Sequence, residues 1–226
     1  METERTVEFD KAFTDCVSNY RTLIFEADVV NNETSDEQKR ELEALAEDIA
    51  GKYKVGEINS IPAIAATRKA YKACGKDPNR YRPSQEQLMR RIVRGLGLYY
   101  VNALVDAGNE LSLKTGCSVG CFDADKIEGE RVTLGVGRAG EPYEGIGRGI
   151  LNIEGLPVFR DAVGGIGTPT SDNERTKLSL DTRHIFVTVH LFDSSIDADK
   201  VAELFAEIFG RWGNAQNIRH RLYRLK

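Results

Sequence analysis

Three polar residues near the middle of the chain are spaced so that they fall on one face of a helix. Asn102, Asp106 and Asn109 are four and three residues apart, and Tyr99 precedes them at a similar interval. Side chains three or four positions apart are neighbours on a helix surface. A carboxylate between two carboxamides can orient a polar ligand, but the same group can also face solvent or hold the next turn in place. We take Asn102, Asp106 and Asn109 as candidate catalytic residues and keep the structural alternatives open.

A segment rich in glycine and hydroxyl groups, residues 164–174, supplies a second set of polar groups. It has the composition of a loop, and loops carried by a rigid scaffold often hold binding residues. Exposed backbone N–H groups and short polar side chains in such a loop are suited to contacting a small ligand. The predicted pocket residues in this segment are Gly165, Gly167, Thr168, Thr170, Ser171 and Asp172.

Five arginines lie around a predicted helix and form a local positive patch. The helix is expected from Ser84 onward, because Pro83, Ser84 and Gln87 match a capping box. Its apolar residues recur at helical spacing and would face a core: Leu88, Met89, Ile92, Val93 and Leu96. The arginines precede the helix or lie off that stripe, and they are candidates for a nucleic-acid contact: Arg80, Arg82, Arg90, Arg91 and Arg94.

The overall charge limits how this patch can act. A formal net charge of −4 argues against a general nucleic-acid binder, whose affinity comes mainly from neutralising phosphates. A local patch remains compatible with that charge. The basic segment from Arg219 to Lys226 is a second candidate patch, or else a solvated terminal tail. Upstream of the five arginines, Arg68 either joins their patch or pairs with Asp77.

The cysteines and histidines offer weaker candidates. Cys121 is a further candidate catalytic residue as a thiol nucleophile, but such a cysteine is more often a small buried hydrophobe. Cys117 and Cys121 lie four residues apart, and His184 and His190 follow on a later strand, without the two close ligand pairs typical of a zinc site. No serine, histidine and aspartate are spaced as a catalytic triad. We predict no metal and no cofactor.

The elements that must position these residues alternate between helices and short strands, which indicates an α+β fold. Strand-like patterns cover 7–9, 21–30, 118–122, 131–136, 157–160 and 184–192, and the last alternates as a strand with one buried face. Helical patterns cover about 34–51, 62–75, 84–94, 98–110 and 197–209. We expect a curled, mostly antiparallel sheet with flanking helices.

Length and composition are those of one globular domain. A chain of 226 residues can form one sizeable core, so we predict a single domain over 1–226, with an N-terminal extension over 1–54 and a C-terminal helix over 197–210 before the basic tail. No segment approaches the roughly twenty apolar residues that span a bilayer. The N-terminus lacks the basic and apolar segments of a secretory signal. We expect a cytoplasmic protein with no membrane partner.

Six short motifs, in order, resemble the B3/B4 module of the phenylalanyl-tRNA synthetase beta subunit. Residues 101–109 are similar to the module's VVDxTN helix, and residues 115–127 are similar to its GxPxHAFDxDKL segment. Later stretches resemble its GxIxVRxAxxGE, LVIxD and TxxIL segments: 129–141, 157–161 and 182–185. The run RPSQEQLMRR at 82–91 resembles the short standalone members. The resemblance spans about residues 55–192 and implies the B3/B4 fold.

In the synthetase this module is the editing site, which hydrolyses tyrosine wrongly attached to phenylalanine tRNA. The histidine of the family's HAFD motif corresponds to Gly120 here, and Cys121 stands at the alanine position. The tyrosine-sensing glutamate of the family's GGExS motif has no counterpart at that step of the 165–172 stretch. We therefore place Gly120 in the expected substrate pocket and do not carry tyrosine specificity over. The synthetase's catalytic and anticodon-binding parts have no counterpart in the sequence, so we expect no aminoacylation by this chain alone.

One main hypothesis follows from the resemblance and the arginines. The chain would bind the acceptor end of an aminoacyl-tRNA and hydrolyse a mischarged aminoacyl ester in trans. Such an ester is already activated, so a positioned water and donors for the developing oxyanion suffice, and the terminal ribose hydroxyl can assist. The alternative is a non-catalytic B3/B4-fold protein that binds a small amino-acid-like ligand, RNA or a protein partner. A metal-dependent enzyme is a third alternative.

Overall fold

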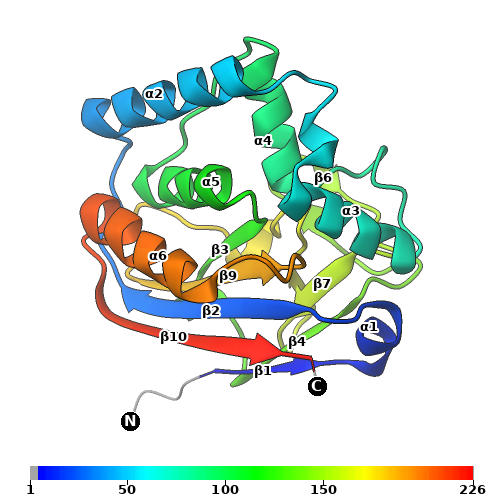
Figure 1. Cartoon of the computed structure of the whole chain (residues 1–226). Coiled ribbons are helices and arrows are strands. Elements are labelled where there is room, and N and C mark those ends of the chain that lie inside the picture. The colour runs from blue at the N-terminus through cyan, green and yellow to red at the C-terminus, as the bar shows by residue number, and fades with distance from the viewer. Residues whose placement is uncertain (1–4, 226) are drawn as a thin grey trace.

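The computed structural model describes residues 5–225 of the chain (Figure 1). The described part contains six α-helices: α1 (Lys11–Cys16), α2 (Asp36–Lys52), α3 (Pro62–Ala73), α4 (Ser84–Val93), α5 (Ala103–Thr115) and α6 (Ala198–Gly213). Its ten strands are β1 (Thr6–Phe9), β2 (Arg21–Asp28), β3 (Val119–Asp123), β4 (Arg131–Val136), β5 (Glu144–Gly145), β6 (Gly149–Ile150), β7 (Pro157–Arg160), β8 (Gly165–Gly167), β9 (His184–Leu191) and β10 (Gln216–Arg224).

The strands form two four-stranded sheets and a small hairpin. The strand orders are β1-β4-β7-β8 and β10-β2-β9-β3, and β5 pairs with β6. Among the described strands, the β1–β4 pair is parallel and the other pairs are antiparallel. The α+β prediction with mostly antiparallel pairing is confirmed. The long strands are divided between two packed sheets where the sequence pattern had suggested one curled sheet.

The two sheets share a core, and helices cover the outer face of one of them. Ile24 of β2 and Phe186 of β9 pack in the same cluster as Leu134 of β4. The opposite faces of β2 and β9 pack against α5 and α6, where the rings of Phe25 and Phe205 stack with centroids 3.9 Å apart. Figure 1 shows this arrangement, with α5 and α6 on one side of β2 and β1 on the other. Burial of β2 and β9 on both faces provides the main hydrophobic stabilisation of the fold.

After the exposed His184 at its start, β9 is buried on both faces, so the prediction of a single buried face for this strand is wrong. Thr188 and His190 are 0% and 3% exposed. His190 is accommodated because the Tyr20 hydroxyl bonds to its Nδ1 at 2.7 Å. The alternation of polar and apolar residues in β9 therefore separates the face that packs on the other sheet from the face that packs on α5 and α6. It does not indicate a face exposed to water.

A second helical layer lies beyond α5. Apolar side chains of α2, α3 and α4 form a separate cluster that includes Leu113 of α5. In Figure 1, α2 crosses above α5 and meets α4 near its end. None of the helices within residues 5–225 has the length and continuous apolar surface that crossing a bilayer requires.

Helix α5 begins at Ala103 and not near Leu98. Asn102 has an extended backbone, and its side chain accepts a hydrogen bond from the Val105 N–H at 3.0 Å, which makes it the N-cap. Tyr99 and Val101 therefore precede the helix and are 53% and 51% exposed. The predicted helix start at about residue 98, and the helix face that Tyr99 would share with Asn102, are wrong.

Two other helix starts also differ from the capping patterns. Helix α2, expected over about 34–51, begins at Asp36, and Ser35 caps it by accepting a hydrogen bond from the Gln38 N–H at 3.1 Å. At α4 the capping position is Pro83, with no side-chain cap, and the helix ends at Val93. Because the chain leaves the helix there, Leu96 is 58% exposed instead of facing the core. The apolar stripe of α4 otherwise packs as predicted.

The basic C-terminal segment is a strand and not a solvated tail. β10 pairs antiparallel with β2, from Arg224 opposite Arg21 to Gln216 opposite Asp28. Arg219 lies 3.7 Å from the Glu26 carboxylate on the neighbouring strand. Part of the positive charge of this segment is therefore compensated within the sheet.

Candidate functional site

The 168–172 segment forms a tight turn where the two sheets meet the start of α4. It follows β8 and lies against the outer edge of β3, where the Cys121 N–H donates to Asp172 Oδ2 at 3.1 Å. On the other side, the Ser84 N–H at the start of α4 donates to the Pro169 carbonyl at 2.7 Å. The structure thus brings the predicted loop, the predicted strand and the predicted helix start into one junction.

Most hydroxyl groups of the turn are used within the fold. Thr168 Oγ1 accepts the N–H groups of Thr170 and Ser171 at 3.2 and 3.1 Å and donates to the Ser171 carbonyl at 3.0 Å. The Tyr71 hydroxyl of α3 bonds to the Thr170 hydroxyl at 2.8 Å. Thr168 and Thr170 are buried. Ser171 and Asp172 are the partly accessible polar residues of the turn.

Asp172 is the ionisable group of this junction. The Cys121 N–H fixes its Oδ2 atom, whereas Oδ1 receives no hydrogen bond from a described residue. Burial raises the pKa of Asp172 to about 7, and the hydrogen bond from Cys121 offsets this only in part. Near neutral pH the carboxyl therefore exists in both protonation states, which suits a general acid or base.

Three predicted pocket glycines are packing sites for aromatic rings. A Cβ atom at Gly120 would lie 2.7 Å from Cζ of Phe122, and one at Gly167 would meet the same ring. A Cβ at Gly165 would lie 2.8 Å from the Tyr143 ring. Phe122 and Tyr143 are 1% and 2% exposed. The space that we expected to hold a substrate beside Gly120 and Gly167 is thus filled by Phe122.

The polar residues at the start of α5 bind neighbouring chain segments. Asp106 is buried, and it accepts hydrogen bonds from Thr34 Oγ1 at 2.5 Å and from the Val101 N–H at 3.3 Å. Burial raises the pKa of Asp106, while hydrogen bonds from Thr34, Val101 and Asn109 act against the shift. With Asn102 as the N-cap, this group holds the segments before α2 and α5 in place. These contacts favour the alternative that Asn102, Asp106 and Asn109 hold neighbouring chain segments in place and do not bind a ligand.

Cys121 connects α5 to the junction as a small apolar side chain. A Cβ atom at Gly108 of α5 would lie 2.6 Å from Cys121 Sγ, so the thiol packs directly on the helix. Burial raises the pKa of Cys121 well above its ordinary value. A buried thiol that stays protonated is a poor nucleophile. The contribution of Cys121 to the junction is its backbone N–H.

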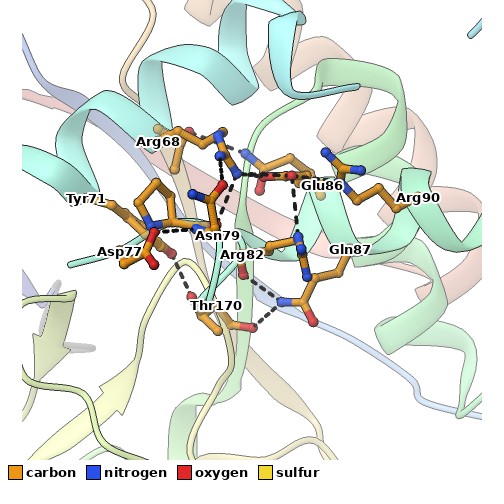
Figure 2. Close-up of polar contacts among 12 residues, drawn as sticks. Arg68, Tyr71, Asp77, Asn79, Arg82, Glu86, Gln87, Arg90 and Thr170 are labelled. Atoms are coloured by element: carbon orange, nitrogen blue, oxygen red, sulfur yellow. Dashed lines mark hydrogen bonds and ion pairs between the residues drawn. The ribbon is translucent and has the colours of Figure 1, made fainter. Parts of the chain in front are cut away.

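A buried glutamate organises the arginines around α4 (Figure 2). Glu86 is fully buried, and its carboxylate accepts hydrogen bonds from Arg68 Nη1 at 2.9 Å and from Arg90 Nε at 2.8 Å. The other terminal nitrogen of Arg68 donates to Asn79 Oδ1 at 2.6 Å, so the alternative pairing of Arg68 with Asp77 is wrong. Sequence periodicity gave no sign of this cluster, although the i, i+4 spacing of Glu86 and Arg90 could have indicated the pair.

The five predicted arginines differ in their availability to a ligand. Arg90 is held by Glu86, and Arg91 donates to the Leu96 carbonyl at 3.1 Å. Arg82 Nε lies 3.8 Å from Glu86 Oε1, which is already paired with other arginines, and the Arg82 side chain is 44% exposed. The exposed members are Arg80, Arg82 and Arg94.

The β5–β6 hairpin brings an arginine that the sequence did not single out to this junction. The Ile146 N–H donates to the Asp172 carbonyl at 3.1 Å, which fixes the hairpin beside the turn. Arg148, at the hairpin tip, donates to Gln87 Oε1 at 2.6 Å. Gln87 Nε2 in turn donates to the Arg82 carbonyl at 2.7 Å. We call the exposed side chains of Arg80, Arg82 and Arg148 the arginine rim.

The histidines and cysteines do not come together as ligands. His190 is buried against Tyr20, and burial lowers its pKa to about 3. His184 instead contacts Asp125 at 3.0 Å on the surface. Within residues 5–225 there is no group of three histidine, cysteine or carboxylate side chains that could hold a metal ion.

Two surface cavities lie away from the junction. One of about 550 Å³ is lined by backbone and side chains around Lys76, Gly137 and Gly155. Lys76 is tied down there by the carbonyls of Asn152 and Glu154, at 2.9 and 2.7 Å. The other, of about 260 Å³, is lined by Arg5, Glu26, Asp28, Asp125, His184 and Arg219, among others. Neither is lined by a predicted catalytic or substrate-pocket residue, and the second includes Arg219 of the basic C-terminal segment.

The structure has two packed, mostly antiparallel sheets, and the 168–172 turn joins a sheet edge to the start of α4. These features define an α+β domain with its candidate site at that edge. The family model for the B3/4 domain matches residues 66–205, so the chain belongs to the B3/4 domain family. The family resemblance that the motifs predicted is confirmed.

Two curated relatives are phenylalanine–tRNA ligase beta subunits, from Bartonella henselae and Bartonella quintana. Each is 30% identical over 118 residues, which covers 48% of this chain and 14% of the subunit. A crystal structure of an N-terminal fragment of the phenylalanyl-tRNA synthetase beta subunit from Pyrococcus horikoshii aligns with 96% of this chain and 52% of its own, at 13% identity and a TM-score of 0.48. The chain therefore spans a small part of the length of its curated relatives.

Proposed function

We propose that this chain acts in the cytoplasm, where it binds the aminoacylated acceptor end of a tRNA and hydrolyses a mischarged aminoacyl ester in trans. Membership of the B3/4 domain family and the similarity to tRNA ligase subunits support this assignment. One observation of the site carries it. The partly accessible carboxyl of Asp172, with Oδ1 unbound, lies in a turn that hydrogen bonds connect to both Arg82 and Arg148.

The arginine rim is suited to the phosphates of an acceptor end. Arg82 and Arg148 are both linked to Gln87, whose Nε2 also donates to the Thr170 carbonyl at 3.4 Å. Guanidinium groups pair well with phosphate oxygens. The acidic residues elsewhere on the chain do not cancel the patch, because salt screens exposed charges beyond about 8–10 Å. A tRNA end held at the rim would place its terminal ester near the turn.

The test is a deacylation assay with a panel of tRNAs that each carry a wrong amino acid, run against buffer alone. We expect hydrolysis of at least one member, with Arg82→Glu and Arg148→Glu each weakening tRNA binding by about tenfold, or roughly 1.4 kcal/mol. Arg40→Glu is the matched control, because Arg40 is exposed on α2, away from the rim. Absence of hydrolysis across the panel, together with unchanged affinity in both rim variants, would contradict the proposal.

One observation favours the non-catalytic alternative, in which the chain binds an amino-acid-like ligand, RNA or a protein without hydrolysis. The buried Phe122 ring fills the space beside Gly120 and Gly167 in which we expected the aminoacyl group. Thermal-shift measurements separate the two functions, because a ligand that binds the folded state raises its stability. Stabilisation by a free amino acid but not by tRNA would favour the non-catalytic function.

A further inference from the structure

We infer that Asp172 is the general base of the deacylation reaction, and that its Oδ1 atom takes a proton from the water that attacks the aminoacyl ester. This inference rests on the proposed function. Asp172 does not correspond to the histidine of the HAFD motif or to the glutamate of the GGExS motif in the synthetase module. It also replaces Asp106 and Cys121 as the leading catalytic candidate.

The geometry fixes one oxygen of Asp172 and leaves the other for chemistry. Oδ2 is held by the Cys121 N–H at 3.1 Å, and the Asp172 carbonyl is held by the Ile146 N–H at 3.1 Å. The residue is therefore restrained from β3 and from the hairpin together. Oδ1 lies on the side of Gly167, where it receives no hydrogen bond from a described residue. A base needs this combination of a fixed carboxyl and a free lone pair within reach of water.

The groups around Asp172 leave its charge uncompensated. The titratable neighbours of Asp172 are the thiol of Cys121 on β3 and the hydroxyl of Tyr143 before β5. Burial and the charge of Asp172 raise the pKa of both groups, so both are neutral at pH 7. On the side of α4, the Glu86 carboxylate is already paired with arginines. Because desolvation dominates, Asp172 titrates near neutral pH instead of near pH 4. A carboxyl with that behaviour accepts a proton more readily than an ordinary surface aspartate.

The reaction balances without any further reactant. An O–H bond of water breaks, its proton goes to Asp172 Oδ1, and the water oxygen forms a bond to the ester carbonyl carbon. The bond from that carbon to the ribose oxygen then breaks, and the ribose oxygen takes the proton back from Asp172. The products are the free amino acid and a tRNA with a free terminal hydroxyl, and the carboxylate is regenerated.

The test compares the wild-type chain with Asp172→Asn, which keeps an oxygen acceptor for the Cys121 N–H but cannot accept the proton. Single-turnover deacylation is measured from pH 5.5 to 8.5, after subtraction of the rate in buffer. We expect the Asn variant to be at least about 100-fold slower. The wild-type rate should rise about tenfold per pH unit below pH 7 and level off above it, following the titration of Asp172. Asp125→Asn, at an exposed aspartate, is the control.

The outcomes separate this inference from the proposed function. If the wild type hydrolyses a mischarged tRNA and Asp172→Asn does so within threefold of its rate, the general-base role is wrong and the deacylase function stands. A wild-type rate that keeps rising with pH above 8, as direct attack by hydroxide would give, also overturns the role. If the wild type hydrolyses no member of the panel, both the function and the inference fail. Equal tRNA affinity of the two proteins at pH 5.5 would show that the rate loss is chemical.

Discussion

Replacing Asp172 with asparagine should stabilise the protein at alkaline pH and leave it nearly unchanged at acid pH. The folded carboxyl has a pKa of about 7 and an ordinary value of 3.8, so the folded state binds this proton more tightly than the unfolded state does. The stability that the proton contributes is fully present below about pH 4 and is lost as the pH rises toward 7. Asparagine does not titrate, so the variant avoids that loss.

The magnitude follows from the size of the shift. A change from 3.8 to about 7 corresponds to roughly 4 kcal/mol, at about 1.36 kcal/mol per pH unit. Partial solvent access to the carboxyl lowers this figure through screening. We therefore expect Asp172→Asn to be more stable than the wild type by about 2–4 kcal/mol at pH 8, and by less than about 1 kcal/mol at pH 4.

Urea unfolding at a series of pH values measures this difference. The free energy of unfolding is obtained for both proteins from pH 4 to pH 8 by linear extrapolation, with far-UV circular dichroism as the probe. Asp181→Asn, at an exposed aspartate, should give no comparable pH-dependent gain. A difference between wild type and Asp172→Asn that is the same at both ends of the range would refute the argument that burial perturbs this carboxyl.

Two further substitutions test how the site is built. Glu86→Gln leaves two partly buried arginines without their counter-charge and should destabilise the fold by about 3–5 kcal/mol in urea unfolding. The control Glu47→Gln, on the exposed face of α2, should cost less than about 0.5 kcal/mol. Similar losses in both variants would show that the ion pairs contribute little. Gly167→Ala drives a methyl group into the Phe122 ring and should cost about 1–3 kcal/mol, whereas Gly164→Ala meets no atom within 4 Å; equal melting temperatures for the two alanine variants would mean that the ring moves freely.

The sequence located the junction better than it described its interior. The order of the motifs identified the family, and the loop at 165–172 does meet β3 and the start of α4. Helical spacing, however, could not show that Asn102 is a cap. An asparagine side chain can hydrogen-bond to the backbone and so begin a helix instead of lying within it. The spacing of polar residues does not distinguish these two positions.

Charge patterns predicted the presence of a basic region but not which arginines are free. Arg90 is neutralised by Glu86, a residue whose burial is decided by the packing of α3 against α4. Arg148 is remote in sequence and reaches the rim only because the hairpin folds against the turn. In the same way, Phe122 reads as an ordinary strand residue, and only the tertiary structure shows its ring occupying the space beside Gly120 and Gly167. Long-range contacts of this kind have no local signature.

The measurement that tests the central claim most directly is a crystal structure with a non-hydrolysable acceptor-end analogue, in which an amide replaces the ester of a 3′-aminoacylated adenosine. We predict the amide carbonyl beside Asp172 Oδ1, the ribose and phosphate toward Arg82 and Arg148, and the aminoacyl group in space that the Phe122 ring vacates or borders. Binding of the analogue in one of the two remote cavities, or no bound analogue in crystals soaked at concentrations that saturate the protein in solution, would show that Asp172 is not the catalytic base.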